Sequence, residues 1–333
     1  MKLRGWASLT ACVLAGSLGA SACPPIPAPL RDITANGYYI DAQHSIPDPA
    51  LKAKDEAAVK PLEGFLAQVS AQADRTLAAQ DQAAAACGLD WLSAWAQGSA
   101  LLGQMSSSQA EYERKWLLCG LGLAYLKMKD EASPAQRSAI EPWLESLADK
   151  VETFEDGQKH HNNHYYWAAL AAGAVGLACH QEAHWQWARR GYLEALQAIG
   201  PDGSLPLEMA RGRKALAYHN FALAPLVLLA ELGRQKGEDW YGLQGGALGR
   251  LAALTIKGIA DPSVFQAMSG KEQAELPKGS ILGWAEFYSR RDPGLGAQAL
   301  IDPKHVPVNP RLGGDLRELA EHWGSVEQER GAH

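Results

Sequence analysis

Apolar residues recur every three or four positions along most of the chain, a spacing that places them on one face of an α-helix. Short breakers rich in Ser, Pro, Asp and Gly separate the periodic runs. No stretch alternates convincingly between apolar and polar residues. The pattern therefore predicts an all-α protein, with helices over residues 55–86, 88–103, 108–130, 135–153, 163–179, 181–199, 206–234 and 243–260.

The distribution of residue types within these runs indicates how the helices pack. Many carry Ala, Gly and Leu on one face and mixed polar residues on the other, as helical hairpins packed in layers do. No linker divides the chain, and the differing hairpin lengths argue against a regular helical repeat array. We therefore expect a single domain over residues 23–333, with an irregular lid segment at about 37–54 and a less regular tail at about 290–333.

The first 22 residues have the features of an export signal. Lys2 and Arg4 form a charged start, an apolar or small-residue stretch follows, and Ala20-Ser21-Ala22 fits a small-x-small cleavage site. The apolar run is too short to span a membrane. A lipoprotein alternative stays open because Cys23 follows the predicted cut, although the leucine usual before such a cysteine is absent.

Cleavage there would leave four cysteines, and an oxidising compartment permits disulfides. Cys119 and Cys179 lie inside apolar helical runs, so we expect them to be buried thiols. Cys23 and Cys87 flank polar segments and are the candidate pair.

Charge limits the classes of partner. The 333 residues carry a formal charge of −6, and loss of the two positive charges of Lys2 and Arg4 makes it −8. A chain this acidic has no overall basic field to attract nucleic acid or an acidic membrane surface. We expect no nucleic-acid partner, no membrane span and a monomer. Any anionic partner must be met by a local positive cleft.

A first cluster of polar residues stands at the mouth of an apolar helix, in the stretch KHHNNHYYWAALAAGAVG at residues 159–176. Asn162 and Asn163 have a simple alternative role as helix caps. His160 and His164 are four residues apart, which suits a shared metal, but no glutamate or third ligand lies nearby. We therefore expect no metal at this cluster.

A second cluster follows in GSLPLEMARGRKALAYHNFALAPL, residues 203–226. Arg211 and Tyr218 are seven residues apart, which is two helical turns, so we expect them on the same side of one helix with Lys214 between them. Caps alone do not explain an arginine, a tyrosine, a histidine and an asparagine together.

Such a set, without paired carboxylates, suits β-elimination of a polyuronate. The reaction removes the proton at C5 of a uronic acid and expels the oxygen at C4. Asn163 and Arg211 are suitable donors to the uronate carboxylate, where they would stabilise the enediolate-like transition state. Tyr218 would take the proton, its pKa lowered by Arg211, with His164 as a second base or carboxylate partner. A two-carboxylate hydrolase is a weaker alternative, since Glu208 is the only acid close to either cluster.

Both clusters closely resemble those of the helical-toroid alginate lyases, the periplasmic poly(β-D-mannuronate) lyases of alginate-producing bacteria. The likeness runs over about residues 85–320 and keeps the order and spacing of the set, which makes it more specific than one short motif. The matching text is Asn162-Asn163-His164, Tyr166-Trp167-Ala168-Ala169, Arg211, Ala215-Leu216-Ala217-Tyr218-His219-Asn220, Trp91-Leu92, Trp95-Ala96, Arg114-Lys115-Trp116, Gly246-Ala247-Leu248-Gly249-Arg250-Leu251 and Arg311-Leu312-Gly313-Gly314-Asp315.

The resemblance implies an incomplete α/α toroid with a deep cleft, an anionic polysaccharide substrate, a periplasmic location and no cofactor. By this resemblance Asn163 and Arg211 would neutralise the carboxylate, while His164 and Tyr218 would handle the protons. A family disulfide also fits Cys23 with Cys87.

Further substrate contacts are candidates by the same resemblance or by position. Trp167 and Arg311 would line sugar subsites, although half or more of the tryptophans are expected to be core residues. Tyr39 and His44 belong to the entrance segment, and Tyr112 is placed to reach the cleft. Histidines at 44, 160, 161, 164 and 219 near one acidic-sugar cleft would make substrate preference depend on pH.

Two departures from the family pattern concern the substrate rather than the elimination. The entrance segment has no lysine before Lys52, and Phe221 stands where alginate-specific members have a tyrosine. They leave three hypotheses: a mannuronate lyase, a lyase that also accepts glucuronan or hyaluronan, and a non-catalytic polysaccharide-binding scaffold.

Overall fold

The computed structural model of the protein describes residues 23–331. The predicted export signal at residues 1–22 lies outside the described residues. Within them the fold is all-α, as the periodicity predicts, apart from short 3-10 turns, two isolated β-bridges and one antiparallel pair of two-residue strands, β1 (Val308–Asn309) and β2 (Gly314–Asp315). The helices are α1 (Pro49–Ala79), α2 (Gln82–Gln97), α3 (Ser108–Met128), α4 (Pro134–Asp156), α5 (Asn163–Ala178), α6 (Glu182–Ala198), α7 (Pro206–Met209), α8 (Ala215–Gln235), α9 (Leu243–Ala260), α10 (Ser263–Ser269), α11 (Trp284–Arg291) and α12 (Leu316–Gly331).

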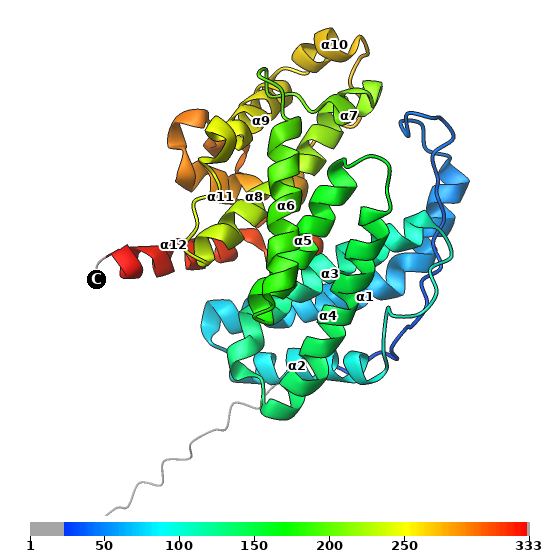
Figure 1. The fold of residues 1–333 in the computed structure, drawn as a ribbon, viewed down its shortest axis with the longest axis vertical. Helices are drawn as coiled ribbons and strands as arrows, with labels where there is room; N and C mark the ends of the chain where they lie inside the picture. Colours follow the sequence, from blue (N-terminus) through cyan, green and yellow to red (C-terminus); the bar gives the residue numbers. More distant parts are fainter. Residues whose placement is uncertain (1–22, 332–333) are drawn as a thin grey trace, which may run out of the picture.

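Helix α5 forms the centre of the molecule, with α3, α4, α6 and α8 packed around it (Figure 1). A helix surrounded by others has no polar face, and α5 is apolar along most of its length. Its many alanines and glycines let the neighbouring helices approach closely. At Gly176 a Cβ atom would lie 2.6 Å from the backbone nitrogen of Trp185 in α6. Only glycine permits the two backbones to approach so closely. The apolar sequence after the first polar cluster is therefore the core helix that holds the cluster in place.

Polar caps set where several helices begin. Asp48 accepts hydrogen bonds from the backbone nitrogens of Ala50 and Leu51, so α1 starts at Pro49 rather than at residue 55. Asp81 caps α2 in the same way, and it divides the run that the sequence predicts as one helix over 55–86. The predicted lid at 37–54 is accordingly wrong in its second part, where residues 49–54 are helical.

The predicted helix over 206–234 is also divided. Helix α7 ends at Met209, a 3-10 turn covers Gly212–Lys214, and α8 starts at Ala215. Gly212 has a positive φ of 57°, which a continuing helix does not allow. The expectation that Arg211 and Tyr218 share one helix is therefore wrong, since Arg211 precedes the 3-10 turn.

The C-terminal part is more regular than expected. Its predicted irregular tail at about 290–333 contains the whole of α12, which packs against α1 and α11. The run is strongly polar, so the apolar period that marks a helix is weak there.

The cysteine expectations are confirmed. Cys23 and Cys87 form a disulfide with their Cα atoms 5.5 Å apart, whereas Cys119 and Cys179 are free and buried. The strap that follows Cys23 is also held by two core indoles. Trp91 donates to the carbonyl of Pro24 at 3.2 Å, and Trp95 donates to that of Pro27 at 3.0 Å.

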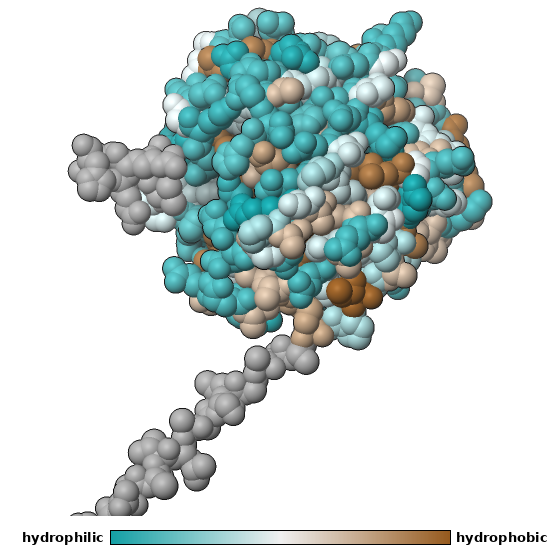
Figure 2. All heavy atoms as spheres, turned by 60° about the horizontal axis from the view of Figure 1, so that its bottom comes forward, coloured by the Kyte–Doolittle hydropathy of each residue, from teal (hydrophilic) through white to brown (hydrophobic). Residues whose placement is uncertain are grey.

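One described helical stretch, residues 212–235, is long and apolar enough to cross a membrane. It lies inside the protein, with 83% of the apolar window buried, so its composition is explained by core packing. Hydrophilic residues dominate the face shown in Figure 2, with separate small groups of hydrophobic ones between them.

Candidate active site

The two polar clusters meet where α5 begins and where the chain passes from α7 into α8. The start of α3 adds Tyr112. The lid, residues 37–48, is the blue loop at the right of Figure 1, and it contacts the group through Tyr39 and Gln43. Asn162 is the N-cap of α5, and its side chain accepts a hydrogen bond from the backbone nitrogen of His164 at 2.9 Å. The cap role expected for Asn162 is thus confirmed, and it fixes how the next two side chains are directed.

Asn163 is fully buried and bound to Glu208. The carboxylate of Glu208 accepts from the backbone nitrogen of Asn163 at 2.8 Å and from its Nδ2, which lies 3.0 Å from both carboxylate oxygens. Both oxygens lie on the same side of the amide nitrogen, so they engage one of its two hydrogens and leave the other available. The Oδ1 atom of Asn163 is buried without a hydrogen-bond partner among the described residues.

Arg211 also approaches the carboxylate of Glu208. Its Nε is 3.9 Å from Glu208 Oε2, and its guanidinium carbon is 4.5 Å from the ring centroid of Tyr218. Its Nη1 donates to the carbonyl of Gln43 in the lid at 3.3 Å. Glu208 therefore connects the two clusters. Sequence reasoning gave it no role in elimination, although its place three residues before Arg211 was a signal for one.

The electrostatics of Tyr218 differ from the expectation. The pKa of its phenol is raised, because burial outweighs the lowering effect of Arg211. The guanidinium lies against the ring rather than beside the oxygen, so it stabilises the phenolate only weakly. The predicted lowering of the Tyr218 pKa by Arg211 is therefore wrong for this arrangement.

His164 stacks on Tyr112, with ring centroids 3.8 Å apart and ring planes at 18°. Its Nδ1 is buried and has no hydrogen-bond partner among the described side chains and backbone groups. Burial and the nearby cations Lys115 and Arg211 hold the pKa of His164 well below its usual value. The imidazole is thus neutral at neutral pH and able to accept a proton or a hydrogen bond.

Lys115 is the buried cation on this side of the site. Its Nζ lies 2.6 Å from Glu155 Oε1 and 4.4 Å from the ring centroid of Tyr112. Tyr112 therefore has Lys115 near its ring and stacks on His164, which brings it to the site as expected.

The lid brings Tyr39 to Tyr218. The two phenol oxygens are 3.5 Å apart, and the Tyr39 oxygen is also 3.4 Å from Nζ of Lys214. Asp41 holds the turn of the lid by accepting from the backbone nitrogens of Ser45 and Ile46. His44 is exposed on this turn, with its ring centroid 5.7 Å from that of Tyr39.

Arg311 lies on the side of Trp116, with its guanidinium carbon 4.5 Å from that ring centroid. Trp116 is in turn 6.0 Å from the ring of His164. Arg311 already binds Glu63 at 2.9 Å and Glu113 at 3.0 Å. The structure therefore places Arg311 near the cluster, but with its charge largely compensated.

Trp167 is a correction to the expected subsites. Its side chain is 2% exposed, and its Nε1 donates to the carbonyl of Phe221 at 3.0 Å. The indole packs on the ring of Phe221 with centroids 5.0 Å apart. A sugar cannot stack on a ring that is almost completely buried. Trp167 is therefore a core residue that supports Phe221.

The expected cleft of five histidines is also wrong. His219 is buried, where its Nε2 accepts from the backbone nitrogen of Leu205 at 2.9 Å and its Nδ1 donates to the carbonyl of Ala215 at 2.7 Å. His161 pairs with Glu194 at 2.7 Å, away from His164. Of the five, His44 lies against Tyr39 and His164 lies against Tyr112.

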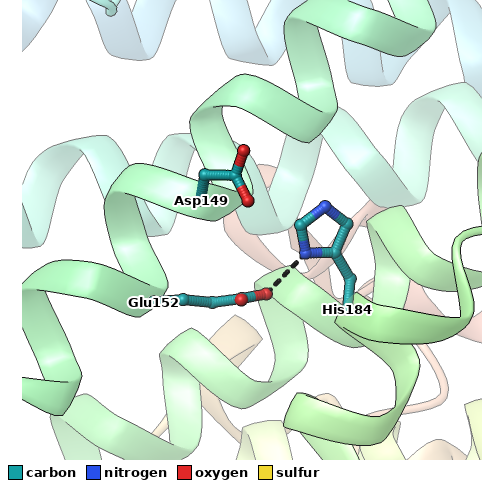
Figure 3. Close-up of side chains that lie close together, drawn as sticks. All are labelled: Asp149, Glu152 and His184. Atoms are coloured by element: carbon teal, nitrogen blue, oxygen red, sulfur yellow. Dashed lines mark hydrogen bonds and ion pairs between the residues drawn. The ribbon is translucent and has the colours of Figure 1, made fainter.

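One group of potential metal ligands occurs among the described residues, and it does not include His160 or His164. It consists of Asp149, Glu152 and His184 on α4 and α6, with ligand atoms within 4.8 Å of one another (Figure 3). His184 Nδ1 lies 2.7 Å from Glu152 Oε1, and this hydrogen bond raises the pKa of the histidine. An ion pair thus explains the group, which touches no residue of the candidate active site.

Comparisons with known proteins agree with this geometry. The family model described as alginate lyase matches residues 32–265. A polysaccharide lyase of Stenotrophomonas maltophilia is 43% identical over 319 residues, which cover 95% of this chain and 96% of that protein. An alginate lyase of Pseudomonas fluorescens is 34% identical over 247 residues, covering 70% of this chain and 66% of that protein.

Solved structures show the same fold. Alginate lyase A1-III from Sphingomonas species A1 superposes with a TM-score of 0.79 at 24% identity, covering 89% of this chain and 85% of that one. An alginate lyase from Bacteroides ovatus gives a TM-score of 0.59 at 17% identity, over 81% and 80% of the two chains. The all-α toroid expected from the sequence is confirmed by this likeness.

Proposed function

This chain belongs to the alginate lyase family, and from this premise we propose that it cleaves (1→4)-linked polyuronates by β-elimination, with poly-β-D-mannuronate as the preferred substrate. The enzyme is a polysaccharide lyase. A variant of alginate lyase A1-III, which shares this fold, is complexed with a tetrasaccharide, and that supports a sugar-chain ligand here.

The observation that carries the proposal is that Asn163 and Arg211 both approach the carboxylate of Glu208, with Tyr218 against Arg211. The free hydrogen of the Asn163 amide and the guanidinium of Arg211 are the donors for the substrate carboxylate. Arg211 presently donates to the lid carbonyl of Gln43, which a carboxylate would replace with a stronger, charge-assisted contact. Donors fixed in this way stabilise the charge that develops on the carboxylate as C5 loses its proton.

Tyr218 is the group placed to move that proton. As phenolate it takes the proton from C5, and the electron pair of the C–H bond passes into the enediolate. This pair then forms the C4–C5 double bond as the bond from C4 to the glycosidic oxygen breaks. The leaving oxygen takes the proton back from Tyr218, so the enzyme ends as it began. His164, neutral because its pKa is lowered, is the second acceptor.

A second candidate is the same elimination with broader uronate choice. Phe221 contacts Trp167 and Trp116 at the floor and brings no hydroxyl for a sugar. The lid has no lysine before Lys52. Both features remove polar contacts that would select one epimer, and a hydrophobic contact discriminates weakly between sugars that differ by a hydroxyl position. The name of the Stenotrophomonas relative, polysaccharide lyase, also supports this candidate.

A substrate panel tests both candidates. Purified protein is given poly-mannuronate, poly-guluronate, glucuronan and hyaluronan, and the new C4–C5 double bond is followed by ultraviolet absorbance. A preference for poly-mannuronate supports the first candidate, and comparable rates on glucuronan or hyaluronan support the second. Binding of these polymers without any absorbance change would contradict both and favour a non-catalytic scaffold.

We also propose that the enzyme acts as a monomer in the periplasm after removal of residues 1–22. The Cys23–Cys87 disulfide supports an oxidising compartment. Cell fractionation with N-terminal sequencing, followed by light scattering of the purified protein, tests the three parts. Recovery of the uncleaved chain from the cytoplasm would contradict the proposal.

A further inference from the structure

Lys214 lies beside the residues proposed to transfer the proton, but it has so far been given no part in binding the carboxylate or in moving the proton. It ends the 3-10 turn before α8, and it is 5% exposed. Its Nζ is 3.4 Å from the hydroxyl oxygen of Tyr39, 4.9 Å from the ring centroid of that tyrosine, and 2.9 Å from Glu275 Oε2. A buried ammonium with one carboxylate partner still has hydrogens to donate, and the Tyr39 oxygen is their acceptor.

The order of donors follows from what each group can do. An ammonium only donates, and a phenolate only accepts. When Tyr218 is deprotonated, the hydroxyl of Tyr39, 3.5 Å away, must supply the hydrogen bond to it. In the structure the Tyr39 oxygen accepts from both the Tyr218 hydroxyl and Nζ of Lys214. Loss of the Tyr218 proton reverses the bond between the two tyrosines, and both donors of the chain then point toward Tyr218.

We propose that Lys214 is a positioning residue that acts through the hydroxyl of Tyr39 to stabilise the phenolate form of Tyr218 needed for proton abstraction. The proposal rests on the lyase function proposed above. It explains how a buried phenol is activated although Arg211 faces its ring rather than its oxygen. It also explains why the lid needs no lysine of its own, because Lys214 supplies the cation beside Tyr39.

The loop after α10 keeps Lys214 in place. Ala274 donates its backbone N–H to the carbonyl of Arg213 at 2.7 Å, and the side chain of Gln273 accepts from the backbone nitrogen of Leu216 at 3.0 Å. These bonds hold the loop on both sides of Lys214. The side chain of Glu275 is 60% exposed, so it compensates the ammonium only in part.

Other charged and titratable groups also face this chain, and they are present equally in a Lys214 variant. They come from each segment that packs around Tyr218. They are Tyr38, Asp41 and His44 on the lid, Glu208 and Arg211 before α8, Glu275 after α10, Tyr112 and Lys115 on α3, and His164 on α5. A change of pH profile confined to Lys214 or Tyr39 variants is therefore assigned to the hydrogen bonds that link Lys214, Tyr39 and Tyr218.

The test is the pH profile of kcat/KM on poly-mannuronate for Lys214→Gln, with Lys214→Arg as the conservative variant. Loss of the ammonium should move the acid limb to higher pH by about one unit, because a neighbouring charge shifts a titration by that order. Lys214→Arg keeps a positive charge and should leave the acid limb close to its position in the unchanged protein. Tyr39→Phe, which breaks the same link without a charge change, should move the limb in the same direction. Lys236→Gln, at the far end of α8, should leave it in place.

An unshifted acid limb with only a raised KM would overturn the proposal, since Lys214 would then merely hold the lid. An ultraviolet difference titration of tyrosinate, with Tyr218→Phe as the reference and no substrate present, gives a second measurement. Tyr218 should ionise at higher pH in Lys214→Gln than in the unchanged protein, and equal ionisation would again overturn the proposal. If no polyuronate is cleaved at all, the proposed function fails, while this titration still decides the role of Lys214.

Discussion

The carboxylate of Glu208 is hydrogen-bonded to both nitrogens of Asn163 across 45 positions of sequence, at 2.8 Å to the backbone and 3.0 Å to the side chain. Burial raises the pKa of Glu208, while the two Asn163 contacts and Arg211 lower it. An acid kept in such a place is costly unless its partners are fixed. It therefore determines where the amide and the guanidinium point.

Replacing this acid should impair catalysis more than binding. In Glu208→Gln the new amide meets the N–H groups of Asn163 with one acceptor fewer, so Asn163 and Arg211 lose their common support. We expect kcat/KM on poly-mannuronate to fall by about 100-fold, as misplacement of catalytic groups commonly causes. Glu131→Gln, at an exposed position, is the matched control. A loss below about twofold would mean that Glu208 does not position the pair.

Removal of the Tyr218 hydroxyl should abolish turnover and preserve binding. The ring of Tyr218→Phe still lies against Arg211, so the carboxylate site persists, but no group at that position carries the proton. We expect kcat to fall by about 10²–10⁴-fold, the usual contribution of an acid–base group. Tyr241→Phe is the control, because its hydroxyl binds Glu231 toward the other end of α8. Unchanged kcat in Tyr218→Phe would contradict the assignment.

Trp167 should behave as a core residue. Trp167→Phe loses the indole N–H bound to the carbonyl of Phe221 and leaves a small void. We expect the free energy of unfolding to fall by about 1–3 kcal/mol, measured by denaturant titration. The KM for poly-mannuronate should hardly change. A large rise in KM with unchanged stability would instead indicate a sugar subsite.

The disulfide should contribute strongly to stability. It joins residues separated by 64 positions. In the chain-entropy model, closing a loop of this length lowers the entropy of the unfolded chain and raises the free energy of unfolding by about 4 kcal/mol. We expect reduction, or the double change Cys23→Ser with Cys87→Ser, to lower the unfolding midpoint. The two agreeing would assign the effect to the bond. Because Cys119 and Cys179 are buried, the folded protein with its disulfide intact should resist alkylation.

Buried His219 predicts acid sensitivity. Burial lowers its pKa to about 4 from the ordinary 6.5, so the unfolded chain takes up a proton that the folded chain rejects. The neutral His219 therefore makes its full contribution to the free energy of unfolding above pH 6.5. This contribution is lost as the pH falls toward 4, by up to about 3 kcal/mol. Unfolding free energies from pH 7 to 4 should show this slope, weaker in His219→Gln and unchanged in His305→Ala, whose side chain is 80% exposed. A flat profile would contradict it.

The sequence by itself determined the features that depend on neighbours along the chain. Apolar spacing identified the helices from α3 to α6 almost at their observed limits, because each helix must bury one face. The polar residues at 162–164 and at 211–218 were recognisable for the same reason, since their spacing and chemistry are local. The pairing of Cys23 with Cys87 followed from the character of the flanking segments and from the family resemblance.

Tertiary structure alone decided which of those residues meet. Glu208 joins Asn163 to Arg211, and Lys214 reaches Tyr39 across 175 positions of sequence. It also buried Trp167 and His219, which no local pattern separates from cleft residues. Burial raised the pKa of Tyr218, against the effect that the adjacent arginine alone would have. The physical reason is that periodicity fixes one helix at a time, whereas contact, exposure and local dielectric depend on how distant segments pack together.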